Sequence, residues 1–154
     1  MGNIVTSILT GNFVSGLQEL NELNNKIRPE IEKGRVNCRN RDGDTWLMRS
    51  IKIRHHVMVA LLFQQPDLDV NCKNKYGFTA MHIACMVSNI RDLRLLVAHP
   101  EMRSLNARNK GGLTPIGLAV HFGQVDCVRE MMGTKGVDLD TKDDGGDGLE
   151  EMAR

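Results

Sequence analysis

The side chains that could bind a metal ion or act as nucleophiles are four cysteines and five histidines. No two cysteines have the C-x-x-C spacing that is common in zinc sites. His55 and His56 are adjacent, so their side chains would diverge on a helix. No Ser/His/Asp or Cys/His set stands at catalytic spacing, and there is no glycine-rich phosphate loop. We therefore expect no enzymatic activity, no metal and no cofactor.

Composition narrows the class of protein further. The formal net charge of the 154-residue chain is +1, which argues against a nucleic-acid binder that acts by electrostatics alone. No apolar run approaches the roughly 18 residues of a membrane span. Residues 4–9 are too short and lack the basic lead of a secretory signal. Without a secretory signal, the cysteines are expected to be reduced thiols. We expect a single intracellular domain, cytoplasmic or nuclear, that is a monomer. The cysteines are Cys38, Cys72, Cys85 and Cys127.

Cationic side chains recur at fixed intervals along the chain. One set is Arg39, Lys73 and Arg108, and the other is Arg41, Lys75 and Lys110. If the intervals correspond to stacked structural units, each set forms a row that could bind an acidic partner or phosphate. The alternative is that both rows are solvated charge.

The same interval governs the rest of the sequence. Thr45, Thr79 and Thr114 lie 34 and 35 residues apart. A period in this range is typical of a solenoid, whose units bury their apolar faces only against neighbouring units. Such a stack is more often a binding surface than an enzyme.

Each unit is predicted to be a hairpin followed by two antiparallel helices. In the second unit residues 74–77 supply the turn, and Thr79 is placed to cap the first helix. Ser88 and Asn89 break that helix, while Gly123 makes the corresponding turn in the third unit and Pro115 occupies the first helical position. The second helices are expected to turn a set of apolar residues inward. That set is Val57, Val59 and residues 61–63, then Ile90, Leu93 and residues 95–97, then Val125, Val128, Met131 and Met132.

These residues resemble the ankyrin repeat. Residues 74–85 match the family pattern D-x-x-G-x-T-P-L-H-x-A-A, and residues 109–119 match it as well, including Thr114 and Pro115. The first unit departs from the pattern at Trp46 and at residues 48–50 but keeps its register. The resemblance implies an all-α solenoid of helix-turn-helix units joined by β-hairpin loops. It would contain about three full repeats and a capping half-repeat at each end.

The resulting partition treats residues 1–154 as one ankyrin-repeat domain. Residues 1–35 form a helical cap made of a helix over 4–9, a turn at Gly11 and Asn12, and a second helix over 13–23. Repeats follow at 36–69, 70–104 and 105–136, and residues 137–154 are a partial repeat. The sequence leaves open whether this is a terminal cap or part of a longer array.

In the ankyrin family, partners usually dock on the concave face, at positions beside the turn and at the end of the first helix. The second and third units place apolar and aromatic residues there, and such side chains commonly dominate binding energy. The alternative is that some of them pack between repeats and lengthen the core. The predicted partner-binding residues are Arg41, Asp44, Lys75, Tyr76, Phe78, Met86, Val87, Lys110, Leu113, His121 and Phe122.

Two positions match patterns for modification. Asn71 resembles the site where an asparaginyl hydroxylase modifies many ankyrin proteins, although a hairpin asparagine can also tie adjacent loops together. Gly2 fits a loose N-myristoylation pattern. No membrane partner is expected unless Gly2 is acylated.

The function predicted from these features is a non-catalytic interaction module that binds a protein and not nucleic acid. Two alternatives remain. The chain could be a structural or regulatory fragment of a larger ankyrin scaffold, or a myristoylated adaptor.

Overall fold

The structure is a computed structural model that describes residues 11–140. Within this range the chain forms helices joined by loops, and the only bridge outside helices pairs Arg39 with Thr45. The predicted all-α architecture is therefore confirmed. The helices are α2 (Gly11–Glu32), α3 (Trp46–Lys52), α4 (His56–Phe63), α5 (Ala80–Met86), α6 (Ile90–Val97), α7 (Pro115–His121) and α8 (Val125–Met132).

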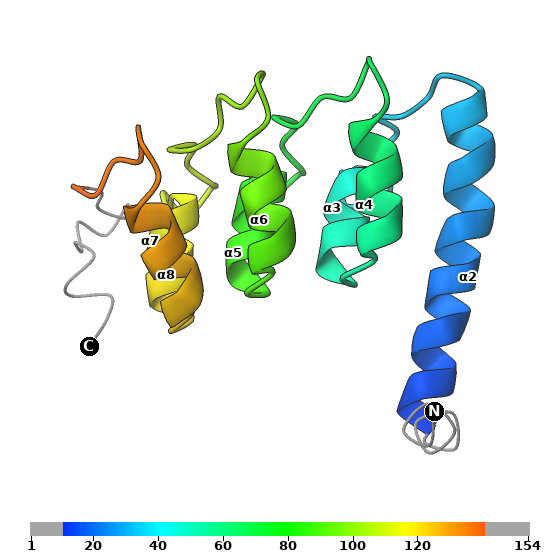
Figure 1. The fold of residues 1–154 in the computed structure, drawn as a ribbon, viewed down its shortest axis with the longest axis horizontal. Helices are drawn as coiled ribbons and strands as arrows, with labels where there is room; N and C mark the ends of the chain where they lie inside the picture. Colours follow the sequence, from blue (N-terminus) through cyan, green and yellow to red (C-terminus); the bar gives the residue numbers. More distant parts are fainter. Residues whose placement is uncertain (1–10, 141–154) are drawn as a thin grey trace.

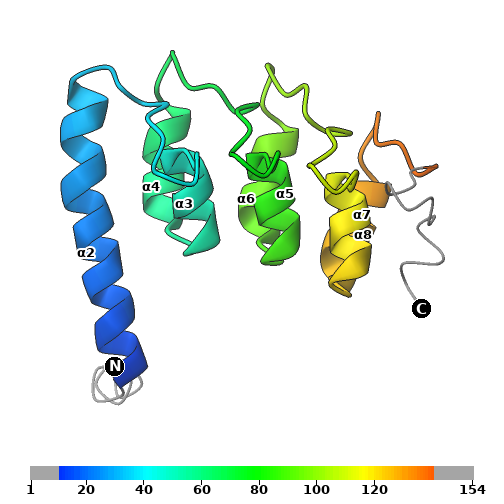
Figure 2. The ribbon, with the colours of Figure 1, turned by 180° about the vertical axis from the view of Figure 1, so that it is seen from behind.

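The helices form a row of three antiparallel pairs, with α2 at one end (Figure 1). One layer consists of α3, α5 and α7, and the other of α4, α6 and α8 (Figure 2). We call these the inner and the outer helices. The loops between pairs all project from the same end of the row. None of the helices in residues 11–140 is long and apolar enough to cross a membrane.

Threonine starts every inner helix. The side chains of Thr45, Thr79 and Thr114 accept hydrogen bonds from backbone N–H groups three residues later. Each bond satisfies one of the donors that a helix N-terminus leaves without a partner. Pro115 stands at the beginning of α7, where its missing N–H has no cost. The helix starts predicted at Thr79 and Thr114 are confirmed.

The turn from inner to outer helix needs one residue in the left-handed region. Arg54, Ser88 and Gly123 occupy equivalent places, with φ of 58°, 52° and 66°. Only glycine adopts this conformation without steric cost, so the first two turns contain strain that the third lacks.

Four apolar residues of the outer helices are not buried, contrary to prediction. Val57 is 66% exposed and Val125 is 65% exposed, and Leu95 and Met132 are exposed as well. In α8 the buried residues are Cys127 and Met131, four apart and therefore on one face. Because a helix turns about 100° per residue, Val125 points about 200° away from Cys127. Each short outer helix thus buries only one narrow face. The periodicity of its apolar residues predicted a wider buried face than the structure has.

The first helical segment also differs from the prediction. The helix expected to end at residue 23 continues to Glu32 as α2, and Gly11 lies inside it rather than in a turn. Leu23 and Ile27 are buried one helical turn apart, so packing against the first pair supports the helix up to Pro29. The expected helix over residues 4–9 and the partial repeat beyond residue 140 lie outside the described residues.

Candidate partner-binding surface

Asparagine side chains shape the hairpin tips. The Oδ1 atom of Asn74 accepts hydrogen bonds from the N–H groups of Tyr76, at 3.0 Å, and Phe78, at 2.9 Å. Asn40 and Asn109 make the same pair of bonds in their own hairpins. This side chain mimics a backbone turn, so each tip presents its flanking residues in a fixed geometry.

Neighbouring tips are bonded to each other. The N–H of Lys75 donates to the carbonyl of Asp42 at 3.0 Å, and the N–H of Lys110 donates to that of Tyr76 at 3.0 Å. Gly77 permits this approach, because a Cβ there would lie 2.9 Å from the Lys110 nitrogen. The tips therefore form one continuous edge.

The predicted partner-binding residues divide into two groups by exposure. Tyr76 is 50% exposed and Phe122 is 52% exposed. Arg41, Lys75, Lys110 and His121 are also exposed, whereas Asp44, Phe78, Met86, Val87 and Leu113 are half-buried. The Phe78 ring packs edge-on against His82, with centroids 5.7 Å apart. Phe78 thus contributes partly to the core, and Tyr76 and Phe122 contribute little to it.

Four of the predicted residues line one cleft between α3 and α5, which we call the aromatic cleft. Its volume is about 150 Å³. Residues at the third hairpin and at the end of α7 do not line it. The lining residues are Asp42, Asp44, Lys52, Asn74, Tyr76, Phe78, Ile83 and Met86.

Both carboxylates at the rim of the aromatic cleft already have partners. Asp42 forms an ion pair with Lys75, and this hydrogen bond lowers the pKa of Asp42 and raises the pKa of Lys75. The Lys75 ammonium also lies 4.9 Å from the centre of the Tyr76 ring. Asp44 accepts a hydrogen bond from the Asn74 side chain at 2.8 Å.

A larger cleft of about 330 Å³ lies between α2 and α3, and we call it the basic cleft. This cleft was not predicted from the sequence, because the first helical segment was expected to end before Lys26. The available signal was Arg49, which stands on α3 where α5 has Ile83. The basic cleft is lined by Glu22, Leu23, Lys26, Arg49, Lys52 and Ile53.

One of the two cation rows is occupied with internal hydrogen bonds. Arg39 donates to the carbonyl of Lys73 at 2.7 Å, and Lys73 donates to that of Arg108 at 3.1 Å. Arg108 donates to the carbonyl of Gly112 at 3.2 Å. This row ties successive hairpins together, which weakens the hypothesis that it binds an acidic partner.

Asn71 has a structural role of the same kind. Its Nδ2 donates to the carbonyl of Glu101 at 2.7 Å, and its Oδ1 accepts from the N–H of Arg103 at 2.9 Å. Asn37 and Asn106 make equivalent bonds. Hydroxylation of Asn71 stays a prediction, and Gly2 lies outside the described residues.

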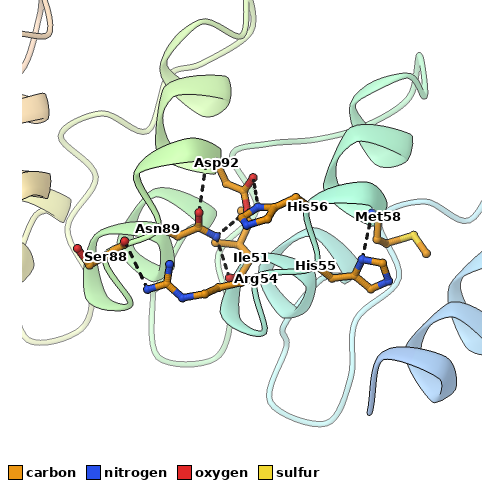
Figure 3. Close-up of polar contacts among 8 residues, drawn as sticks. All are labelled: Ile51, Arg54, His55, His56, Met58, Ser88, Asn89 and Asp92. Carbon is orange, nitrogen blue, oxygen red and sulfur yellow. Dashed lines mark hydrogen bonds and ion pairs between the residues drawn. The ribbon is translucent and has the colours of Figure 1, made fainter. Parts of the chain in front are cut away.

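The histidines serve the fold in three different ways. His82 is fully buried; its Nδ1 accepts from the Thr79 N–H at 3.1 Å and its Nε2 donates to the Leu113 carbonyl at 2.9 Å. Burial lowers the pKa of His82 to about 4, so it is neutral at pH 7. His55 caps α4, whereas His56 pairs with the buried Asp92 at 3.1 Å (Figure 3).

Three of the four cysteines are buried. All four are free thiols. Contact with Cys127 and burial raise the pKa of the Cys85 thiol, which makes it a weak nucleophile. Between residues 11 and 140 no cluster of three or more His, Cys, Asp or Glu side chains could hold a metal ion.

Comparison with known proteins agrees with this architecture. A family model described as ankyrin repeats, in three copies, matches residues 18–104 and 47–143. The chain belongs to the ankyrin repeat family. Ankyrin repeats are in general protein–protein interaction modules, and the family is generally non-catalytic.

Individual relatives match only part of the chain. The SMC5-SMC6 complex localization factor protein 1 of Homo sapiens is 36% identical over 73 residues, covering 47% of this chain and 7% of its own length. The BTB/POZ domain-containing protein 1 of Schizosaccharomyces pombe is 34% identical over 86 residues, which cover 54% of this chain and 6% of its own length. An ankyrin repeat protein of Acanthamoeba polyphaga mimivirus is 26% identical over 97 residues, which cover 63% of this chain and 12% of its own length. The chain therefore spans a small part of each relative.

Proposed function

We propose that this ankyrin stack is a non-catalytic module that binds a protein partner through its inner face, formed by the hairpin tips and α3, α5 and α7. The observation that carries the proposal is the aromatic cleft. Tyr76, Phe78 and Met86 surround it, and each leaves part of its side chain accessible. Aromatic and methionine side chains in such positions contribute strongly to binding energy at protein interfaces.

Charge and hydrogen bonding around the cleft also favour binding over catalysis. Asp42 and Asp44 are engaged with Lys75 and Asn74, so neither is placed as a free acid or base. The tips that carry these residues are fixed by Asn74 and by the bonds between hairpins. A rigid surface loses less conformational entropy on binding.

Photo-crosslinking tests the choice of face. A photoreactive phenylalanine analogue would replace Tyr76 in one protein and Val57 in another, and both would be irradiated in cells that produce the protein. The two positions are comparably exposed and apolar, but Val57 lies on the outer helix α4. We expect discrete protein adducts from position 76 and none from position 57.

A second substitution checks that the adducts depend on the cleft. Met86→Glu places a carboxylate among its apolar walls and should greatly reduce the adducts formed at position 76. Adducts of equal yield at both positions, or at position 57 alone, would contradict the proposal.

A further inference from the structure

The basic cleft contains three cations and one carboxylate. Lys26 extends from α2, while Arg49 and Lys52 extend from α3, and Glu22 is the single acidic residue of its lining. The floor is apolar, since Leu23 is buried and Ile53 is half-buried against the core. The surface therefore combines concentrated positive charge with hydrophobic area.

The cations of the basic cleft form no ion pair among the described residues, whereas several other cations do. Among residues 11–140, Lys75, Arg94 and Arg35 each pair with an acidic side chain. No ion pair between described residues includes Lys26, Arg49 or Lys52. Three cations around one concavity, with Glu22 as the single carboxylate of its lining, raise the positive potential there.

Arg49 is also held in place. Its guanidinium lies 4.9 Å from the centre of the Trp46 ring, and the residue is half-buried. A guanidinium stacked on an aromatic ring keeps its N–H donors free for a planar anion such as a carboxylate.

The basic cleft and the aromatic cleft are neighbours, because Lys52 lines both. Lys75 offsets the charge of Asp42, whereas Asp44 accepts only from the neutral Asn74 amide and keeps its charge. The rim of the aromatic cleft therefore favours an apolar rather than an acidic side chain. The two adjacent clefts, together called the groove, thus offer cations at the α2 end and apolar walls at the α5 end.

We propose that this groove binds an extended acidic segment of a partner protein. Asp or Glu carboxylates of the segment lie over Lys26, Arg49 and Lys52, and an apolar side chain of the same segment enters the aromatic cleft. This inference rests on the proposed function and adds the chemistry of the bound segment and the part of the groove that each kind of side chain occupies.

Selection from a display library of random short peptides on the wild-type protein tests the proposal. The selected peptides are expected to combine acidic residues with one large apolar residue. The tightest peptide would then be synthesised with a fluorescent label, and its affinity measured by anisotropy at several salt concentrations. A charge-screened interaction weakens as ionic strength rises.

Charge variants identify the site. Lys26→Gln combined with Lys52→Gln should weaken binding of the labelled peptide at least about tenfold, since charge-assisted contacts are lost. It should also reduce the salt dependence. A control is Arg91→Gln, which removes one exposed cation from the outer helix α6 and should leave the affinity unchanged. Circular dichroism would confirm that each variant is folded.

Each other outcome overturns the proposal. Selection of neutral or basic peptides, or equal affinities in the double variant and the Arg91→Gln control, would exclude an acidic segment in this groove. The wild type could also bind a single-stranded oligonucleotide while the selection enriches no acidic peptides. That result would assign the cations of the basic cleft to a different ligand. Adducts at position 76 in the crosslinking experiment would show that the proposed function survives such a result.

Discussion

The two junctions between helix pairs solve the same packing problem with different chemistry. At the first junction, between α3/α4 and α5/α6, the buried Asp92 bonds to Asn89 at 2.6 Å and to His56 at 3.1 Å (Figure 3). At the second junction, between α5/α6 and α7/α8, Cys127 stands 35 residues after Asp92, and Ile90 stands 34 residues after His56. A hydrogen-bonded histidine–aspartate pair and an apolar pair thus occupy equivalent places.

The polar contacts of the first junction extend to the backbone. Asn89 donates to the carbonyl of Ile51 at 3.1 Å, and Arg54 donates to the carbonyls of Val87 and Ser88. At the second junction Gln124 donates to the carbonyl of Met86 at 3.1 Å. A buried charge is costly to leave unpaired but can often be replaced by apolar residues at little net cost. The first junction should therefore be the more sensitive to single substitutions.

Copying the second junction into the first gives the largest expected effect. His56→Ile removes one of the two side-chain partners of the buried Asp92, leaving Asn89, and should lower the free energy of unfolding by about 3–5 kcal/mol. Adding Asp92→Cys converts the pair into the Ile90–Cys127 arrangement and should recover most of the loss. Urea unfolding followed by circular dichroism measures both. A double variant as unstable as the single one would show that the two junctions are not interchangeable.

At the hairpin tips the two junctions are alike, and a glycine makes each possible. Gly77 has φ of +79°, and a Cβ there would lie within 2.9 Å of the Lys110 backbone nitrogen. Gly77→Ala should cost about 3 kcal/mol, from an unfavourable backbone conformation and a clash with rigid backbone. The control is Gly123→Ala, where φ is +66° but no atom lies within 4 Å, and about 1 kcal/mol is expected. Equal losses in thermal unfolding would argue against the close approach of the tips.

Only the second junction contains a buried histidine. His82 on α5 bonds to the carbonyl of Leu113, just before α7. The pKa of His82 in the folded protein is about 4, below the usual value near 6.5. Because the unfolded chain takes up a proton first, this group contributes full stability above about pH 6.5, and the contribution is lost as the pH falls towards 4. Between pH 7 and 4.5 the wild type should lose about 2–3 kcal/mol through His82.

Comparison of two variants isolates this loss. His82→Gln should lower stability at pH 7 but remove this part of the pH dependence in urea unfolding. Ile116→Val also lowers stability, by trimming a buried side chain, and should keep the full pH dependence. The same slope in all three proteins would rule out His82 as the source.

Local chemistry explains which of these features were predictable. The caps at Thr79 and Thr114, the turn at Gly123 and the start at Pro115 depend on a few adjacent residues, and the structure contains each of them. The His56–Asp92 pair joins residues of different helix pairs. The sequence reveals this pair only if each residue is compared with the residue one repeat and two positions further along the chain.

The extent of helices and faces depended on packing that the sequence does not display. The second helix of the N-terminal cap was expected to end at residue 23, yet burial of Leu23 and Ile27 accompanies a helix that continues to Glu32. The basic cleft was missed for the same reason, because Lys26 faces α3 only when that helix continues. Exposure of Tyr76 followed from its place beside a turn, whereas partial burial of Phe78 depended on contact with His82.

The loop clamps provide the smallest and sharpest test of the comparison. Asn71 bonds to the carbonyl of Glu101 at 2.7 Å and to the N–H of Arg103 at 2.9 Å. Asn37 bonds at the same two distances to Asp67 and Asp69. Each clamp makes two partly exposed hydrogen bonds, so Asn71→Ala and Asn37→Ala should each cost about 1–2 kcal/mol in urea unfolding. If the junctions differ only at their helical ends, the two losses will agree within about 0.5 kcal/mol. A larger loss at one clamp would mean that the difference between the junctions extends from the helices to the loops.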